Sequence, residues 1–205
     1  MALVYNHEEI TPRELKPALL ELVGISRAAV EAHYKLYQGY VNKRNEILEK
    51  LTGIDLSAAN QVYSEVRALK VDLSFAIGGI KNHEIYFEHL GGHGGEPSGI
   101  FGDLVRRDFG STGEWKADLK ATGMAGRGWA WTAYDWDEGR LFNYIGDAQN
   151  TFPVWNATAL VALDVYEHAY FIDFGTDRSG YIDAFFDNLD YDVVNDWAQQ
   201  YGVRP

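Results

Sequence analysis

The chain has 205 residues, of which 46% are hydrophobic, enough to bury a core in one domain or in two smaller ones. It contains no cysteine, which excludes disulfides, thiolate catalysis and cysteine-ligated zinc or iron–sulfur sites, and leaves histidine and carboxylate side chains as the candidate metal ligands. A formal net charge of -12 argues against nucleic acid as a partner, because binding to phosphates depends on lysine and arginine.

The sequence contains no recognisable export signal or membrane span. Residues 1–10 include His7, Glu8 and Glu9 where a secretory signal would need an apolar stretch, and no apolar run approaches the roughly 20 residues that a spanning helix needs. We therefore predict a cytoplasmic protein that does not associate with membranes.

The first half of the chain has helical periodicity. Thr11 followed by Pro12 suits the N-cap and first turn of a helix, and Ser26 suits the N-cap of a long amphipathic helix over residues 26–51. Helical character resumes over residues 58–86, where the pair Gly78-Gly79 is a weak point. This half is predicted to be all-α.

A glycine-rich segment, residues 91–97, marks a domain boundary, so we predict domains over residues 1–92 and 93–205. The second half mixes helices with short strands, which predicts a small antiparallel sheet packed against helices and an α+β fold for the chain. The helices are expected at 98–109, at 113–124 and after residue 164, and the three strands at 128–134, 140–145 and 159–164.

One short stretch has metal-ligand spacing. Asp164 and His168 lie four residues apart beside an apolar segment, and His33 and His83 each lie in a predicted helix. Three imidazoles and one carboxylate could converge on one ion. That donor set suits a first-row transition metal, and the carboxylate favours manganese or iron.

His33, Tyr37 and Tyr40 are predicted to share one helix face. At about 100° per residue, the seven residues from His33 to Tyr40 return the side chain to within roughly 20° of its first direction. This stripe could face an ion and its entrance. The alternative for the tyrosines is an ordinary aromatic core stripe.

Several stretches spread over nearly the whole chain resemble, in the same order, motifs of the iron/manganese superoxide dismutase family. The motifs DVxEHAY and GWAW, together with histidines at matching intervals, are the most specific. The stretches are ISRAAVEAH (25–33), YVN (40–42), NHEIYF (82–87), GEPSG (95–99), FGS (109–111), GWAW (128–131) and DVYEHAY (164–170).

The resemblance implies an N-terminal α-helical hairpin domain followed by a C-terminal domain with a small sheet and helices. It implies one manganese or iron ion per subunit between them, cycling between M(III) and M(II) to convert superoxide to O2 and H2O2. The implied ligands are His33, His83, Asp164 and His168. As an antioxidant oxidoreductase, the protein would take superoxide as its small-molecule substrate.

The resemblance also implies a proton route to the ion. Tyr40 matches the gateway tyrosine, and Gln149 matches one of two places where the family keeps a glutamine that holds the metal-bound solvent, with Asn150 as the alternative one residue on. The other place falls on Gly79. Because a glutamine in the later place is more often associated with manganese members, the sequence leans towards manganese.

Further residues take roles from the resemblance. Phe87, Trp129 and Tyr166 would form an aromatic shell that keeps the site dry, and Arg178 would attract the anionic substrate. Glu167 would cross a dimer interface to His168 of the other subunit, which implies a homodimer, with a tetramer of two dimers left open.

Three departures from the family pattern are visible. Tyr37 stands where a second histidine is usual, Phe171 stands where its tyrosine partner is usual, and one residue is missing between His33 and Tyr40. The alternative hypothesis is therefore a metal-binding structural relative with little turnover; an iron oxygenase, which would need open coordination positions, is a weaker one. The remaining histidines, His7, His89 and His93, are expected at the surface.

Overall fold

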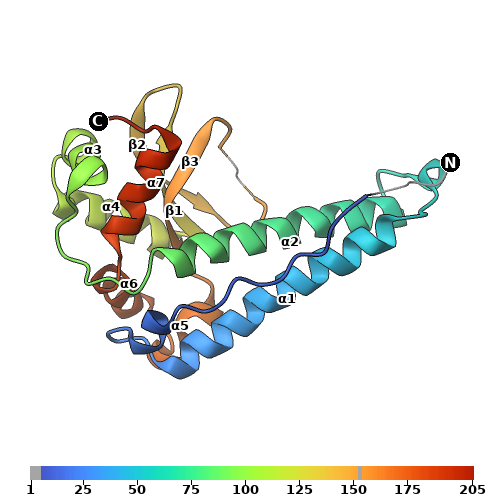
Figure 1. Cartoon of the computed structure of the whole chain (residues 1–205), viewed down its shortest axis with the longest axis horizontal. Helices are drawn as coiled ribbons and strands as arrows, with labels where there is room; N and C mark the ends of the chain where they lie inside the picture. Colours follow the sequence, from blue (N-terminus) through green and yellow to red (C-terminus); the bar gives the residue numbers. More distant parts are fainter. Residues whose placement is uncertain (1–5, 152–153) are drawn as a thin grey trace.

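The computed structural model describes residues 6–151 and 154–205. Residues 1–5, which include the start of the predicted first domain and half of the segment considered for an export signal, lie outside this description, as do residues 152 and 153. Two long helices, α1 (Arg27–Leu51) and α2 (Glu65–Glu88), form a hairpin that extends from a more compact C-terminal half (Figure 1). The predicted helical hairpin is confirmed.

Serine side chains fix where both hairpin helices begin. Ser26 Oγ accepts a hydrogen bond from the N–H of Ala29, and Ser64 Oγ accepts one from Arg67. Both serines thereby satisfy backbone donors that the first turn leaves free. The second helix begins at Glu65 and not near residue 58, because a short 3-10 turn, η2 (Leu56–Ala58), and a loop come first.

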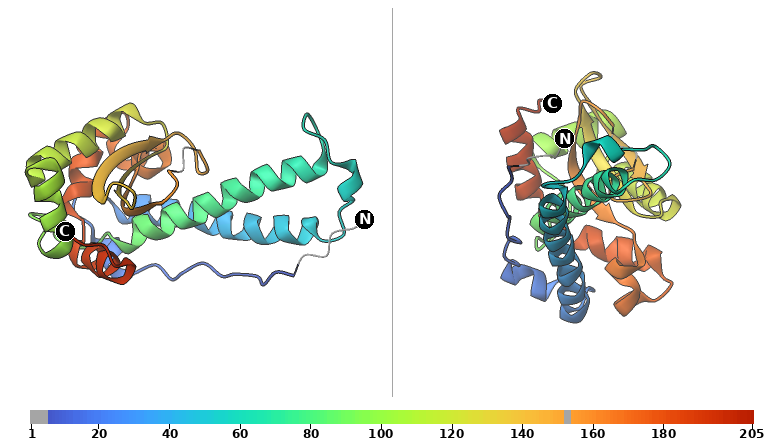
Figure 2. Two further views of the ribbon diagram at one scale, coloured as in Figure 1. Left: turned by 90° about the horizontal axis from the view of Figure 1, so that it is seen from above. Right: turned by 90° about the vertical axis from the view of Figure 1, so that its right-hand side faces the viewer.

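The helix expected from Thr11 is wrong. Residues 6–16 run extended beside the hairpin and lead into a 3-10 helix, η1 (Pro17–Glu21) (Figures 1 and 2). Side chains of α1 take the place of a helical ladder: Asn45 exchanges two hydrogen bonds with the backbone of Ile10, and the Arg13 N–H donates to Tyr37. We call residues 6–16 the N-terminal strap.

The C-terminal half contains the predicted three-stranded antiparallel sheet, in the order β2-β1-β3, with helices packed against it (Figure 1). The α+β fold is confirmed. Its elements are α3 (Gly99–Phe109), α4 (Thr112–Ala125), β1 (Trp129–Asp135), β2 (Arg140–Gly146), β3 (Ala157–Asp164), α5 (Glu167–Phe174), α6 (Arg178–Asp187) and α7 (Tyr191–Tyr201).

One hydrophobic core joins the two halves. It contains residues of α1 and α2 such as Val30 and Phe87 together with strand residues such as Trp129 and Leu163. A second, smaller cluster lies between α1 and α2 and includes Leu51. The side chains in the joint core therefore hold helix and strand ends from both halves at fixed separations.

The surface position expected for His89 is wrong. Its side chain is fully buried, whereas His93 is exposed and His7 is partly exposed. The predicted weak point at Gly78 and Gly79 does not interrupt α2. None of the helices in the described parts of the chain is both long and apolar enough to cross a membrane.

Candidate metal centre

Three helices or helix ends and one strand end bring four side chains to a single point. His33 lies on α1, His83 on α2, Asp164 at the end of β3 and His168 on α5. The four ligand atoms lie within 4.8 Å of one another, although His33 and Asp164 are 131 residues apart in the sequence. Among the described residues they form the one such group of histidine and carboxylate side chains.

The carboxylate lies at the centre of the group. Asp164 Oδ2 is 3.1 Å from Nε2 of both His33 and His168, and 3.6 Å from Nε2 of His83. Its other oxygen, Oδ1, accepts a hydrogen bond from the N–H of Tyr166, where the strand has ended and α5 is about to begin. The strand-to-helix turn thus orients Asp164 and brings His168 beside it one helical turn later.

The donor chemistry fits a transition metal. His83 donates from Nδ1 to the carbonyl of Gly79 at 2.6 Å, so the lone pair of its Nε2 points into the group. That Nε2 is buried and has no hydrogen-bond partner. A buried polar atom without a partner is costly, and a metal ion would satisfy it together with the other two imidazoles and the carboxylate.

The electrostatics favour a cation at this point. Burial lowers the pKa of His83 to about 3 and also lowers that of His33, so both imidazoles are neutral donors. Burial alone would raise the pKa of Asp164, but His168 and His33 outweigh it and hold that pKa below its ordinary value. The carboxylate is therefore charged while buried, which requires a positive partner.

Aromatic rings close around the four side chains. Trp129 meets the His83 ring edge-on with centroids 5.2 Å apart, and Tyr166 stacks on His168 at 5.1 Å. Phe87 lies 5.1 Å from the His33 ring. The three rings predicted for an aromatic shell thus each lie against one of the imidazoles.

Gln149 and Asn150 point in different directions. Gln149 is buried; its Oε1 accepts from Trp129 Nε1 at 3.0 Å and its Nε2 donates to the Tyr40 hydroxyl at 3.3 Å. The side chain of Asn150 instead donates to Ser74 on the exposed side. Of the two predicted candidates, Gln149 is the one beside Tyr40, whose ring lies 5.4 Å from that of His83.

The glycine pair in α2 allows this approach. A Cβ on Gly79 would lie 2.7 Å from the Tyr40 ring, and a Cβ on Gly78 would lie 2.0 Å from the Gln149 carbonyl oxygen. Real Cβ atoms do not come so close. The pair read from the sequence as a weakness of the helix is therefore the surface on which Tyr40 and Gln149 rest.

The comparisons with known proteins cover the chain almost end to end. The family model for the α-hairpin domain of iron/manganese superoxide dismutases matches residues 17–91, and the model for their C-terminal domain matches residues 97–197. The chain belongs to the iron/manganese superoxide dismutase family. It is accordingly an oxidoreductase that dismutes superoxide with an iron or manganese ion.

Relatives in this superoxide dismutase family carry either metal in their names. The iron superoxide dismutase of Aquifex aeolicus is 43% identical over 194 residues, which is 92% of this chain and 90% of the relative. That of Cupriavidus metallidurans is 35% identical, covering 88% and 91%. A manganese superoxide dismutase of Halobacterium salinarum is 33% identical, covering 84% and 85%. The alternative of a relative with little turnover gains no support.

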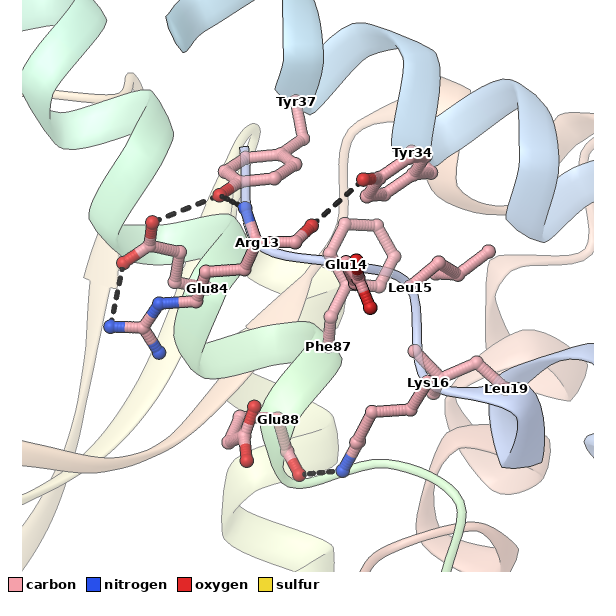
Figure 3. A pocket seen from close by; sticks show the side chains of 10 residues that line it. All are labelled: Arg13, Glu14, Leu15, Lys16, Leu19, Tyr34, Tyr37, Glu84, Phe87 and Glu88. Atoms are coloured by element: carbon pink, nitrogen blue, oxygen red, sulfur yellow. Dashed lines mark hydrogen bonds and ion pairs between the residues drawn. The ribbon is translucent and has the colours of Figure 1, made fainter. Parts of the chain in front are cut away.

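The hydroxyl of Tyr37, one of the departures from the superoxide dismutase pattern, makes hydrogen bonds to residues of its own chain. Its hydroxyl donates to Glu84 Oε1 at 2.9 Å and accepts from the N–H of Arg13, whose guanidinium also pairs with Glu84 (Figure 3). The ring is buried and stacks towards His83 with centroids 6.4 Å apart. Phe171, another of the departures, is 53% exposed.

Arg178 and Glu167 lie at the edge of the centre. The Arg178 guanidinium donates to the carbonyl of Gly126 at 2.7 Å and to the Tyr170 hydroxyl at 3.2 Å, so it is held in one orientation. Glu167 is exposed at the first turn of α5, next to His168.

Two residues of the site were missed from the sequence. Asn82 donates to the backbone and side-chain oxygens of Gln149 at 3.2 and 3.3 Å, and Tyr86 lies 4.9 Å from the His33 ring. Tyr86 also shares a hydrogen bond of 3.2 Å with Tyr181. Asn82 and Tyr86 lie within the NHEIYF motif, so their proximity to His83 was the available signal.

Proposed function

We propose that this chain dismutes superoxide at a single iron or manganese ion held by His33, His83, Asp164 and His168. The observation that carries the proposal is the convergence of four ligand atoms within 4.8 Å, among them a buried His83 Nε2 that has no other partner. When bound, the ion supplies one-electron chemistry between its trivalent and divalent states, by which two superoxide ions and two protons become O2 and H2O2.

The chain's own residues control protons and water. Tyr40 presents a hydroxyl to Gln149 Nε2, and burial raises the pKa of Tyr40, so its Oη keeps the proton until one is required. Gln149 is in turn fixed by Trp129 and Asn82. We assign Tyr40 the delivery of protons and Gln149 their orientation, while Phe87, Trp129, Tyr166 and Tyr37 exclude bulk water.

We propose manganese as the preferred ion. The support is the position of Gln149, which reaches the centre from the loop after β2 while Gly79 leaves the alternative place empty of a side chain. The names of the relatives include both metals and do not choose between them. The test is to reconstitute the apo protein separately with Mn²⁺ and with Fe²⁺ and to measure the dismutase activity of each form. A fully active iron form with an inactive manganese form would reverse the assignment.

Removing the ion is expected to lower the melting temperature, because the four ligands come from both halves and the ion binds only the folded chain. For an ion at 100 times its dissociation constant the loss is about 2.7 kcal/mol. Calorimetry of apo and reloaded protein in the same buffer measures it. Identical melting temperatures would show that no ion is held between the halves.

We propose that Arg178 attracts superoxide although the whole chain carries -12. Arg178→Glu is then expected to slow turnover much more at 0.01 M salt than at 0.5 M, because ions screen the field beyond about 10 Å at 0.1 M. Arg178→Lys keeps the charge but loses the two guanidinium hydrogen bonds to Gly126 and Tyr170. Its turnover should therefore keep the salt dependence of the unsubstituted protein, and it should melt at a lower temperature.

The control for this series is Arg140→Glu, which makes the same charge change on an exposed residue at the start of β2. Rate constants against ionic strength separate the effects. Equal losses for both Arg178 variants at every salt concentration would assign Arg178 an anchoring role and remove the steering one.

We further propose a homodimer, or a tetramer of such dimers, in which Glu167 reaches His168 of the partner subunit. Support comes from the exposed Glu167 and from Phe171 and Ile172, exposed by 53% and 57% on the same helix. Glu167→Ala should raise the dimer dissociation constant at least tenfold, and Glu138→Ala, in the distant β1–β2 turn, should not. Sedimentation equilibrium that finds the unsubstituted chain monomeric would contradict this proposal.

The domain boundary between residues 92 and 93, the cytoplasmic location and the antioxidant role predicted from the sequence remain parts of this proposal. The two family models meet the boundary from either side, ending at residue 91 and beginning at residue 97.

A further inference from the structure

His89, which the sequence placed at the surface, is buried where the two halves of the chain meet. It is the C-cap residue of α2, six residues beyond His83. Its Nε2 accepts a hydrogen bond of 2.9 Å from the backbone N–H of Ala162, two residues before Asp164 on β3. One imidazole therefore joins the helix that carries one proposed ligand to the strand that carries another.

The strand needs an acceptor at this position. In the order β2-β1-β3, one side of β3 has no neighbouring strand, and the Ala162 N–H points out from that side to His89. Ala162 is fully buried, so water cannot take the place of the imidazole. Without His89 the Ala162 N–H, two residues before Asp164, would be a buried donor with no acceptor. A shift of β3 that gave this N–H another acceptor would then lower the free energy of the folded chain.

The imidazole must be neutral to make this contact. Because Nε2 accepts, its lone pair is free of a proton and the ring hydrogen lies on Nδ1. Burial lowers the pKa of His89 to about 3, so the acceptor persists at neutral pH. The Nδ1 atom itself is buried without a partner, a cost that an aliphatic residue would not carry.

The ring is also held rigidly. Phe185 of α6 meets it edge-on with centroids 5.7 Å apart, Trp197 of α7 lies at 6.1 Å and Tyr86 of α2 at 6.4 Å. Tyr86 in turn contacts the ring of His33. Because residues of three helices pack against the ring, His89 has little freedom to move and holds β3 at a fixed position.

We infer that His89 is a positioning residue that fixes Asp164 relative to His83 and thereby sets the affinity and coordination geometry of the metal centre. The inference rests on the proposed function, since the spacing of these two side chains matters only if they share an ion. Their atoms lie 3.6 Å apart, and a displacement of β3 by a fraction of an ångström changes the geometry offered to the ion.

The test compares His89→Phe and His89→Leu, which remove the acceptor, with His89→Gln, whose Oε1 can replace Nε2. The exposed histidine of the neighbouring loop gives the matched control, His93→Gln. Manganese-loaded and iron-loaded holoproteins are titrated with a chelator, their visible spectra are recorded, and the melting temperatures of the apo forms are measured. At least one acceptor-free variant must fold for the comparison, and Leu is the smaller alternative should Phe overpack the site.

Either acceptor-free variant is expected to lose about tenfold or more in metal affinity and to shift the absorption of the trivalent ion, and His89→Gln to recover most of both. A fall in apo melting temperature with unchanged affinity and spectrum would make His89 merely structural and overturn the inference. Failure of His89→Gln to restore affinity would overturn it as well. If the unsubstituted chain bound neither ion, the proposed function would fail first, and that result is distinct from both.

Discussion

Replacing Asp164 with asparagine is expected to abolish tight binding of iron or manganese, and with it turnover. The carboxylate lies 3.1 to 3.6 Å from three imidazole nitrogens and is the one carboxylate of the group. Asparagine keeps the shape and the acceptor for the Tyr166 N–H but removes the charge that attracts the cation. The loss of affinity should exceed the 10- to 100-fold typical of changes to residues that only support ligands.

Metal content after dialysis, chelator titration and dismutase activity measure this result, and circular dichroism of the apo variant checks its fold. Asp103→Asn makes the same chemical change on an exposed residue of α3 and should alter none of these. A variant of Asp164 that kept its full complement of metal would mean that the ion binds elsewhere in the chain.

Gln149→Ala should separate metal binding from turnover. The ligands are untouched, so the ion is retained, but the Tyr40 hydroxyl loses the donor that orients it, and activity should fall about 10- to 100-fold. The buried N–H of Trp129 also loses its acceptor, which should cost about 1–3 kcal/mol of stability, whereas the Asn82 amide keeps the backbone oxygen of residue 149.

Asn150→Ala is the matched comparison, because it truncates the neighbouring side chain, which bonds to Ser74 on the exposed side. It should change activity by less than a factor of two or three. The opposite ranking would move the role to Asn150, and full activity in both variants would leave Tyr40 without an assigned partner. Metal content is measured on the same samples, so that a loss of activity caused by a missing ion is distinguished from one caused by slower proton transfer.

The parts of this molecule that short-range patterns determine were predictable. Ser26 caps its helix as expected, the three strands fall within a few residues of their expected ranges, and Asp164 and His168 are neighbours because one turn follows the strand. The convergence of His33 and His83 on Asp164 and His168 was predicted from the order of the family motifs along the chain and not from helical periodicity.

The parts of the molecule that depend on contacts between residues far apart in the sequence were not predictable. Nothing local distinguishes a strap from a helix at Arg13, whose backbone is held by Tyr34 and Tyr37 more than twenty residues away. His89 follows a helix as a surface histidine could, and contacts with residues far along the chain, the Ala162 N–H 73 residues away and the Phe185 and Trp197 rings, bury it. Such partners depend on tertiary packing, which overrides local preference.

The wide separation of the four candidate ligands along the chain has a consequence for biosynthesis. His33 and His83 are made early, whereas His168 is added only after 167 of the 205 residues. At about 5–20 residues per second the ribosome needs on the order of ten seconds to cover this interval. Through that time the two early imidazoles lie on a hairpin that still lacks its carboxylate. The complete set of four ligands therefore exists only once His168 has been made, so binding of the ion at this site must follow the synthesis of both halves.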